Sequence, residues 1–169
     1  MTGLFFLNKI KYMAVPKKII NFLEKEKAVY KLTEHRKVYT AFDKSRTLKV
    51  PEKTIAKTLV LRSGKDLILA AVGADKNIDL KKIQSVVGNK TAIVSEKLIK
   101  NRLKGVKIGA VPPFGGLWKM PVFMDRKLAK EKEILISSGD YNFSFKIKPK
   151  VLQKINPGMI IGDFGRKKK

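Results

Sequence analysis

The chain has no cysteine and only one histidine, and these two shortages remove several classes of enzyme. Without cysteine there is no disulfide, no thiol nucleophile and no cysteine-bound zinc, which fits a reducing compartment. One histidine cannot build a histidine-based metal cluster, and neither Ser137 nor Ser138 has a partner histidine at a recognisable triad spacing. A lone histidine near a strand end is usually structural, so His35 is interpreted as structural rather than as a catalytic base.

Long apolar runs are also missing. No segment approaches the roughly 20 apolar residues that a membrane helix needs. The apolar run Leu4 to Leu7 is too short for the core of a signal peptide, and no small-residue cleavage site follows it. We therefore expect residues 1–15 to form a loose tail, and we expect a cytoplasmic protein without a membrane partner.

Acidic residues are scarce. The 169 residues include 38 Lys and Arg against 14 Asp and Glu, which gives a formal net charge of +24. A domain this basic repels itself unless it meets a polyanion, and no strongly amphipathic, aromatic-rich basic helix favours a membrane surface. The balance favours a nucleic-acid partner. The alternative is a lysine-rich proteome or the charged surface of a thermophile.

Turn and cap signals divide the chain into short helices and strands. Helices are expected to begin at Pro16, at Thr40 with its capping partner Asp43, at Asp79, and at Pro149. Strands are expected at 29–33, 58–62, 67–72, 91–94, 122–125, 133–137, 143–147 and 159–163. Helices and strands interleave without a regular βαβ rhythm. This predicts an α+β fold with a mixed, mostly antiparallel, barrel-like sheet flanked by helices.

A stripe of lysines lies on one further expected helix, which Ser95 caps and which ends near Gly105. Lys97, Lys100 and Lys104 recur at helical spacing on the side away from its apolar residues. The stripe is either a solvated face or a surface that follows nucleic-acid phosphates, and the sequence leaves both interpretations open.

A loop rich in glycine and proline, residues 109–116, offers exposed backbone N–H groups. A hydrolase without the standard nucleophile, base or metal ligands has to position water and stabilise an oxyanion with such amides. An aminoacyl ester is an activated bond, so modest catalysis of this kind suffices. Trp118 follows the loop, and it either stacks on a nucleic-acid base or packs in the core.

Five motifs in order resemble the YbaK / prolyl-tRNA-synthetase-associated domain family, from about Pro16 to Phe164. They are Glu34-His35 with Val38 to Thr40 and then Ala56 to Leu61, Asp79 to Lys82, Gly109 to Gly115, Leu117 to Asp125, and Ser138-Gly139. Departures are Ala110 and Pro112, where many relatives carry glycine and serine. The resemblance implies an editing domain over residues 16–165, followed by a basic C-terminal tail, residues 166–169.

The resemblance also implies where the site lies. Lys57 matches the lysine that contacts the 3′ end of the substrate and whose loss abolishes activity, and we expect catalysis from Lys57 with the amides of Gly109 and Ala110. Family positions that line the substrate pocket match Phe42, Thr58, Pro113, Gly115, Ser138 and Gly139. We assign tRNA binding to Lys97, Lys100 and Lys104.

The resemblance implies a metal-independent deacylase that removes amino acids from mischarged tRNA in trans. We expect no cofactor and no metal, with tRNA as the partner and an aminoacyl-tRNA synthetase as a further candidate partner. The alternative is a non-catalytic tRNA-binding or synthetase-associated module. A lysine that opens an apolar strand, as Lys57 does, needs an anion or another acceptor to face, which favours the enzyme.

Overall fold

The computed structural model describes residues 13–169. Most of the expected N-terminal tail, residues 1–15, therefore lies outside the described residues. Val15 is 1% exposed and packs in the main core, so the folded part already includes this residue, which we had placed in the tail.

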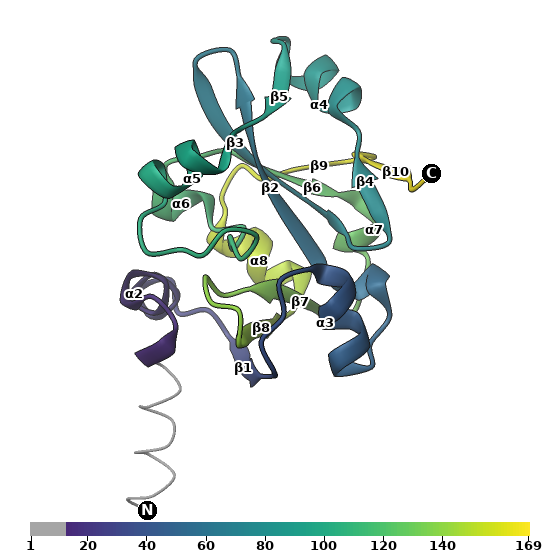
Figure 1. Ribbon diagram of the computed structural model, residues 1–169. Coiled ribbons are helices and arrows are strands. Elements are labelled where there is room, and N and C mark those ends of the chain that lie inside the picture. The colour runs from purple at the N-terminus through teal and green to yellow at the C-terminus, as the bar shows by residue number, and fades with distance from the viewer. Residues whose placement is uncertain (1–12) are drawn as a thin grey trace, which may run out of the picture.

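Ten strands form three sheets in the described part of the chain (Figure 1). The largest has the order β5-β2-β3-β6-β9, the second β1-β8-β7 and the smallest β10-β4. The pairings β3–β6 and β6–β9 are parallel, and the other strand pairings are antiparallel. Because the sheets stay separate, the barrel is open, and the predicted mixed α+β fold is confirmed. The strands are β1 (Tyr30–Glu34), β2 (Ala56–Ser63), β3 (Asp66–Gly73), β4 (Lys76–Ile78), β5 (Thr91–Ile93), β6 (Val122–Asp125), β7 (Ile134–Ser137), β8 (Phe143–Ile147), β9 (Ile160–Gly162) and β10 (Gly165–Lys167).

The helices begin where the sequence places a capping side chain. Thr40, Asp79 and Ser95 each accept a hydrogen bond from a backbone N–H in the first turn of the helix that follows. Gly88 ends α4 in the left-handed conformation, with φ of 75°. The helices are α2 (Lys17–Lys25), α3 (Ala41–Leu48), α4 (Leu80–Val87), α5 (Glu96–Arg102), α6 (Gly115–Trp118), α7 (Arg126–Ala129), α8 (Pro149–Ile155) and the 3₁₀ turn η1 (Glu52–Thr54). In the described part of the chain, no helix has the length and apolar character needed to cross a membrane.

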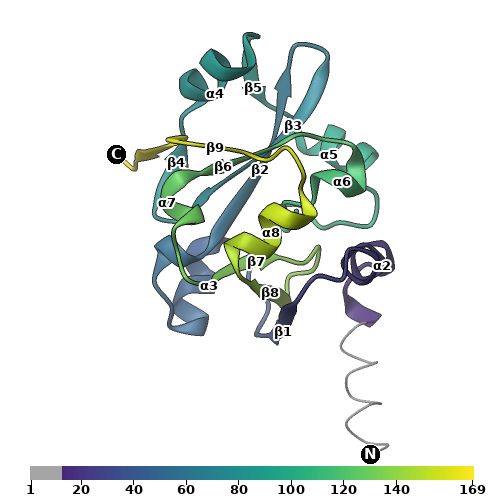
Figure 2. The ribbon, with the colours of Figure 1, turned by 180° about the vertical axis from the view of Figure 1, so that it is seen from behind.

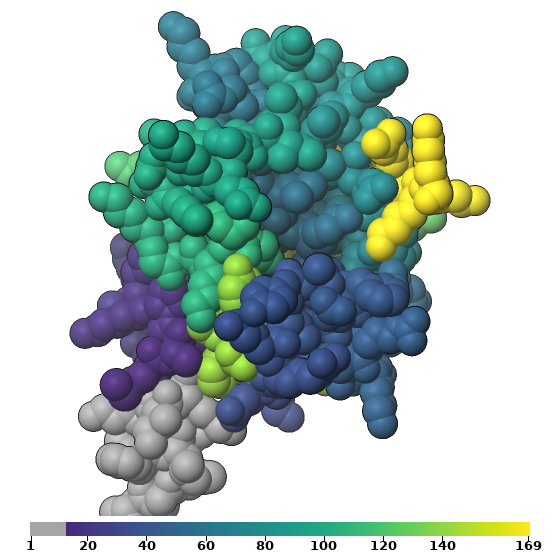
Figure 3. Space-filling view, in the orientation of Figure 1, coloured from purple at the N-terminus to yellow at the C-terminus, as the bar shows by residue number. Residues whose placement is uncertain are grey.

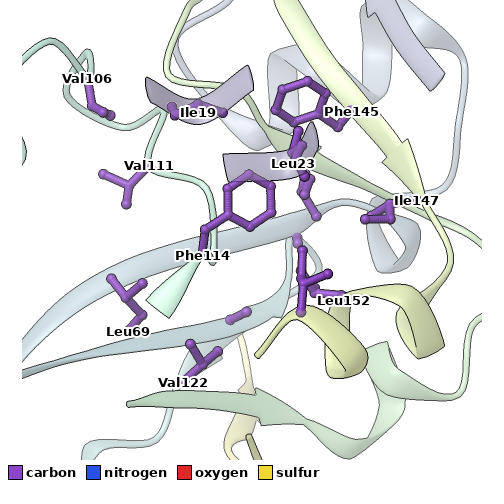
Figure 4. Close-up of a cluster of buried hydrophobic side chains, with 14 of the residues drawn as sticks. Ile19, Leu23, Leu69, Val106, Val111, Phe114, Val122, Phe145, Ile147 and Leu152 are labelled. Atoms are coloured by element: carbon purple, nitrogen blue, oxygen red, sulfur yellow. The ribbon is translucent and has the colours of Figure 1, made fainter. Parts of the chain in front are cut away.

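The β2–β3 hairpin is buried on both faces. Leu69 of β3 points into the main core with Phe114, Phe145 and Leu152 (Figure 4). The alternate residues of the hairpin, such as Ile68, pack into a second cluster beneath α4. Burial on both faces explains why residues 67–72 form an unbroken apolar run rather than an alternating one. The helices α3 and α8 lie on opposite sides of the molecule: α3 faces the viewer in Figure 1, and α8 faces the viewer in Figure 2, which shows the molecule from behind.

Four short elements were not expected from the sequence. These are α6, α7, β4 and β10, and each is only three or four residues long. The pairing of β10 with β4 corrects the expected C-terminal tail, because Arg166 and Lys167 lie in a strand. Asp125 stabilises this end of the chain by accepting hydrogen bonds from the backbone N–H groups of Phe164 and Gly165, at 2.9 and 2.8 Å.

The glycine- and proline-rich loop is held against α8 by one buried side chain. Asn156 is 4% exposed, and its amide donates to the carbonyls of Pro113 and Leu152, each at 2.9 Å. Its Oδ1 accepts from the N–H of Gly115, also at 2.9 Å. A buried loop backbone would otherwise leave these polar groups unsatisfied.

We expect Asn156→Ala to lower the free energy of unfolding by about 2–3 kcal/mol, because it leaves three buried backbone groups without partners. Chemical denaturation followed by circular dichroism measures the loss. The matched control is Asn101→Ala, an exposed position on α5, which we expect to change stability by less than about 0.5 kcal/mol. Equal stability of the two variants would contradict the role assigned to Asn156.

Candidate active site

A pocket of about 260 Å³ opens between α3, the start of β2 and two turns. It is lined by residues 38–41 and 44, 56–59, 109–110, 137 and 140–141. Figure 3 shows the recess between the dark blue segment of α3, the blue segment of β2 and the green turns. Segments that are more than 100 residues apart in the sequence therefore meet at one site.

Four of the predicted site residues line this pocket: Lys57, Thr58, Gly109 and Ala110. Thr58 Oγ1 is buried and has no hydrogen-bond partner within residues 13–169. A buried hydroxyl without a partner is uncommon and is available to bind a ligand atom or a water molecule.

Lys57 lies between this pocket and a neighbouring hollow of about 590 Å³, and it lines both. Its Nζ donates to the carbonyl of Lys76 at 2.6 Å and lies 3.4 Å from Asn77 Oδ1. Half-burial lowers the pKa of Lys57, with a further contribution from the charge of Lys168. The ammonium has three N–H donors, so a third remains to face a ligand.

The turn at Gly109 is fixed by backbone hydrogen bonds. Gly109 has φ of 80°, and Ala110 N–H donates to Lys107 O at 3.0 Å. Gly139 N–H in turn donates to Ala110 O at 2.8 Å, which ties the two turns together. The N–H of Ala110 is therefore already used. Of the two predicted oxyanion donors, Gly109 alone keeps an N–H without an acceptor in the described region.

Ser138 and Gly139 shape the turn beside the pocket instead of lining it. Ser138 is fully buried, and its Oγ donates to Phe143 O at 2.6 Å. Gly139 has φ of 90°, a conformation that disfavours other residues. The turn then presents Asp140 and Tyr141 to the pocket.

Three other predicted pocket residues lie elsewhere. Phe42 is on α3 but is 47% exposed, and its ring lies 5.0 Å from the Arg46 guanidinium carbon. Pro113 is buried, with its carbonyl bonded to Asn156. Gly115 packs so closely that an added Cβ would lie 2.1 Å from Met120 O. These three residues therefore do not line the pocket.

His35 and Trp118 have structural positions. His35 Nε2 bonds to Ser144 Oγ at 2.9 Å, and its Nδ1 lies 2.8 Å from Arg36 O, so both ring nitrogens are engaged. Burial lowers the pKa of His35. Trp118 is partly buried against the main core and does not line the pocket, which favours the core interpretation over stacking on a base.

Several pocket residues escaped the sequence analysis. Asp140 is 8% exposed and accepts from Lys107 Nζ at 2.6 Å and Asn142 N–H at 2.8 Å. Tyr141 donates its hydroxyl to Ile108 O at 2.6 Å. Lys44 is 8% exposed on the inner face of α3. For Lys44, the sequence contained one signal. Its position between the apolar residues at 41 and 48, at helical spacing, places it on the apolar face of the helix.

No group of three or more metal-ligating side chains gathers anywhere in residues 13–169. The lysines predicted to bind tRNA are exposed and do not line the pocket: Lys97 and Lys100 lie on α5, and Lys104 lies in the turn that follows it. In Figure 1, α5 and α3 both lie on the side that faces the viewer.

Comparison with known proteins identifies one family. A family model described as an aminoacyl-tRNA editing domain matches residues 35–155. The chain is 31% identical over 144 residues to the prolyl-tRNA editing protein ProX of Acetoanaerobium sticklandii, covering 81% of this chain and 87% of that protein.

Solved structures agree in fold. One, described as a candidate trans-editing enzyme for prolyl-tRNA synthetase, has a TM-score of 0.79 at 23% identity and covers 89% of this chain and 96% of its own. A hypothetical protein, APE2540, has a TM-score of 0.81 at 18% identity and covers 89% of this chain and 100% of its own. At such identities the likeness concerns the fold alone.

The Lys44 ammonium makes stability depend on pH. Burial lowers its pKa from 10.5 to about 8, so the unfolded chain binds this proton more tightly than the folded chain does. The free energy of unfolding should therefore rise between pH 8 and 10.5, and below pH 8 the charge costs about 3 kcal/mol.

We expect Lys44→Met to raise the free energy of unfolding at pH 7 by about 1–3 kcal/mol and to flatten its increase at alkaline pH. Denaturant titrations at pH 7 and pH 10 measure both effects. Lys90→Met, an exposed position, removes the same charge and is expected to leave the pH dependence unchanged. A destabilised Lys44→Met protein would show that the ammonium has a favourable partner in the folded state.

Proposed function

The chain belongs to the family of aminoacyl-tRNA editing domains, and from this premise we propose that it hydrolyses mischarged aminoacyl-tRNA in trans at the pocket beside α3. The observation that carries the proposal is that every pocket-lining segment, from residue 38 to residue 141, falls within the matched residues 35–155. The name of the similar protein from Acetoanaerobium sticklandii makes the proline tRNA the first acceptor to test.

Hydrolysis at this site needs no protein nucleophile. Water attacks the ester carbonyl carbon, the carbonyl oxygen becomes an oxyanion, and the bond between that carbon and the ribose oxygen breaks. One proton of the water ends on the ribose oxygen and the other goes to solvent, leaving the amino acid as a carboxylate. The N–H of Gly109 is the group that we assign to the oxyanion.

Two polar side chains are assigned to positioning. Thr58 Oγ1, which is buried without a partner in the described region, is proposed to hold the attacking water or the ester. Lys57 is held by Lys76 O and directs its remaining N–H toward the 3′ end of the tRNA. The adjacent hollow, which Lys57 shares with Lys81 and Arg166, is proposed to receive the terminal nucleotides.

The charge of the molecule supports a polyanionic substrate. A net charge of +24 gives a long-range attraction to tRNA, and α5 with the turn that follows it presents three exposed lysines on the pocket side of the molecule. We also propose a cytoplasmic location, because aminoacyl-tRNA is present there. Association with an aminoacyl-tRNA synthetase stays a prediction. The assignment of residues 16–165 to an editing domain also stays a prediction, and the folded part includes Val15 and β10 as well.

We expect Lys57→Ala to lower the single-turnover deacylation rate about 100- to 1000-fold while leaving the fold and most tRNA affinity intact. The loss follows from removing one positioned donor, whereas affinity comes from many distributed lysines. The assay uses mischarged proline tRNA in a buffer containing a chelator, because the proposed hydrolysis is metal-independent.

The matched control is Lys65→Ala in the exposed turn between β2 and β3, which should retain the rate of the unmodified protein. Near-normal turnover by a well-folded Lys57→Ala protein would favour the alternative, a non-catalytic tRNA-binding module. Activity lost in chelator and restored by zinc would overturn the metal-independent mechanism.

Affinity for tRNA should fall steeply with salt, with a log–log slope of about −0.9 for each duplex phosphate neutralised. Changing Lys97, Lys100 and Lys104 to Glu should weaken binding and reduce this slope, as measured by filter binding at several salt concentrations. The control changes Lys148, Lys150 and Lys154 to Glu, an equal change in charge at exposed positions around α8, on the other side of the molecule. Equal losses in both variants would mean that α5 is no local contact surface.

A further inference from the structure

Lys44 is the most deeply buried cation of the pocket, and it has no counter-ion there. It is 8% exposed, and none of the ion pairs or hydrogen bonds within residues 13–169 involves its ammonium. A largely desolvated charge without a partner is unfavourable, and an anionic ligand group in the pocket would offset that cost. The depressed pKa, about 8, is the electrostatic consequence of the same burial.

The pocket cannot supply that partner from its own walls. Its one carboxylate, Asp140, is already paired with Lys107 at 2.6 Å and accepts a backbone N–H as well. The second lysine of the lining, Lys57, is bonded to a carbonyl. The cavity is therefore electropositive, and Lys44 is the charge that remains to be matched by the substrate.

The size and depth of the pocket decide which part of the substrate reaches Lys44. At about 260 Å³, it is smaller than the roughly 300–1,000 Å³ sites that take whole drug-sized ligands. It has room for an aminoacyl group but not for a nucleotide in addition. The half-buried Lys57 and the larger neighbouring hollow are better placed for the nucleotide and its phosphate.

The geometry points to Lys44 as a specificity-determining residue that selects mischarged amino acids with an acidic side chain, aspartate or glutamate, by pairing its ammonium with their carboxylate. This inference rests on the proposed function, because it assigns a substrate class to the same pocket. An acidic side chain neutralises the buried ammonium, whereas an isosteric amide or an alanyl group leaves it unpaired, so the site should discriminate strongly between them.

The test measures binding without hydrolysis. The probes are 3′-amino-3′-deoxyadenosine carrying aspartate, asparagine, glutamate or glutamine through a stable amide, titrated calorimetrically into the full chain. We expect the better acidic probe to bind at least about tenfold more tightly than its own amide counterpart. In Lys44→Met this preference should vanish, and in Lys44→Arg it should persist in part because the charge is kept. Lys49→Met, at the exposed C-terminal end of the same helix, should retain the preference.

Each outcome has one meaning. Equal binding of acidic and amide probes to the unmodified protein overturns the inference, as does an unchanged preference in Lys44→Met. Equal weakening of all four probes in Lys44→Met also overturns it, because the ammonium would then contact the nucleoside or the shared backbone. Failure to cleave any mischarged tRNA would overturn the proposed function instead, and the ratios of probe affinities would still decide the role of Lys44.

Discussion

Burial of the β2–β3 hairpin on both faces is the constraint on which the rest of the molecule depends. One face packs with α2, α8 and the second sheet, and the other packs beneath α4. The hairpin therefore has to be apolar along its length, and polar residues are confined to its ends. Lys57 and Thr58 stand at the start of β2, where the strand leaves the core and meets the pocket. The chemistry of the site is located where the hydrophobic packing stops.

The pocket walls are held by backbone hydrogen bonds rather than by side-chain packing alone. The turn at Gly109 and the turn at Gly139 bond to each other, and Asn156 fixes the loop that continues from the first turn. Such bonds place N–H groups with little freedom to move, which is the preorganisation that oxyanion stabilisation requires. The same bonds remove the Ala110 N–H from use, so the rigidity of the turn limits the number of donors that face a ligand.

Charge acts at two scales. The excess of lysine and arginine gives a field that attracts any polyanion, without distinguishing one tRNA from another. Inside the pocket, the buried ammonium of Lys44, with its lowered pKa, is an unfavourable element of the folded protein, and selectivity is the function that we propose for it. Affinity for tRNA is thereby assigned to the many surface lysines and arginines, and discrimination between amino acids is assigned to Lys44.

The sequence by itself determined the local elements and the family. Caps at Thr40, Asp79 and Ser95, the stop at Gly88 and the strand patterns depend on neighbours within a few residues, and the structure confirms them. Three residues to which the motifs assigned site roles, Lys57, Thr58 and Gly109, line one pocket in the structure. Short elements such as α6 and β10 were missed because their stability comes from packing partners far along the chain.

Only the tertiary structure decided what surrounds each site residue. It placed Pro113 and Gly115 in the packed loop, bonded Lys57 to the carbonyl of Lys76, and brought Lys44 to the pocket wall. Each of these outcomes depends on contacts between segments distant in sequence. Local spacing determines which face of a helix a residue occupies. The segments that pack against that face determine whether the residue meets a counter-charge or solvent.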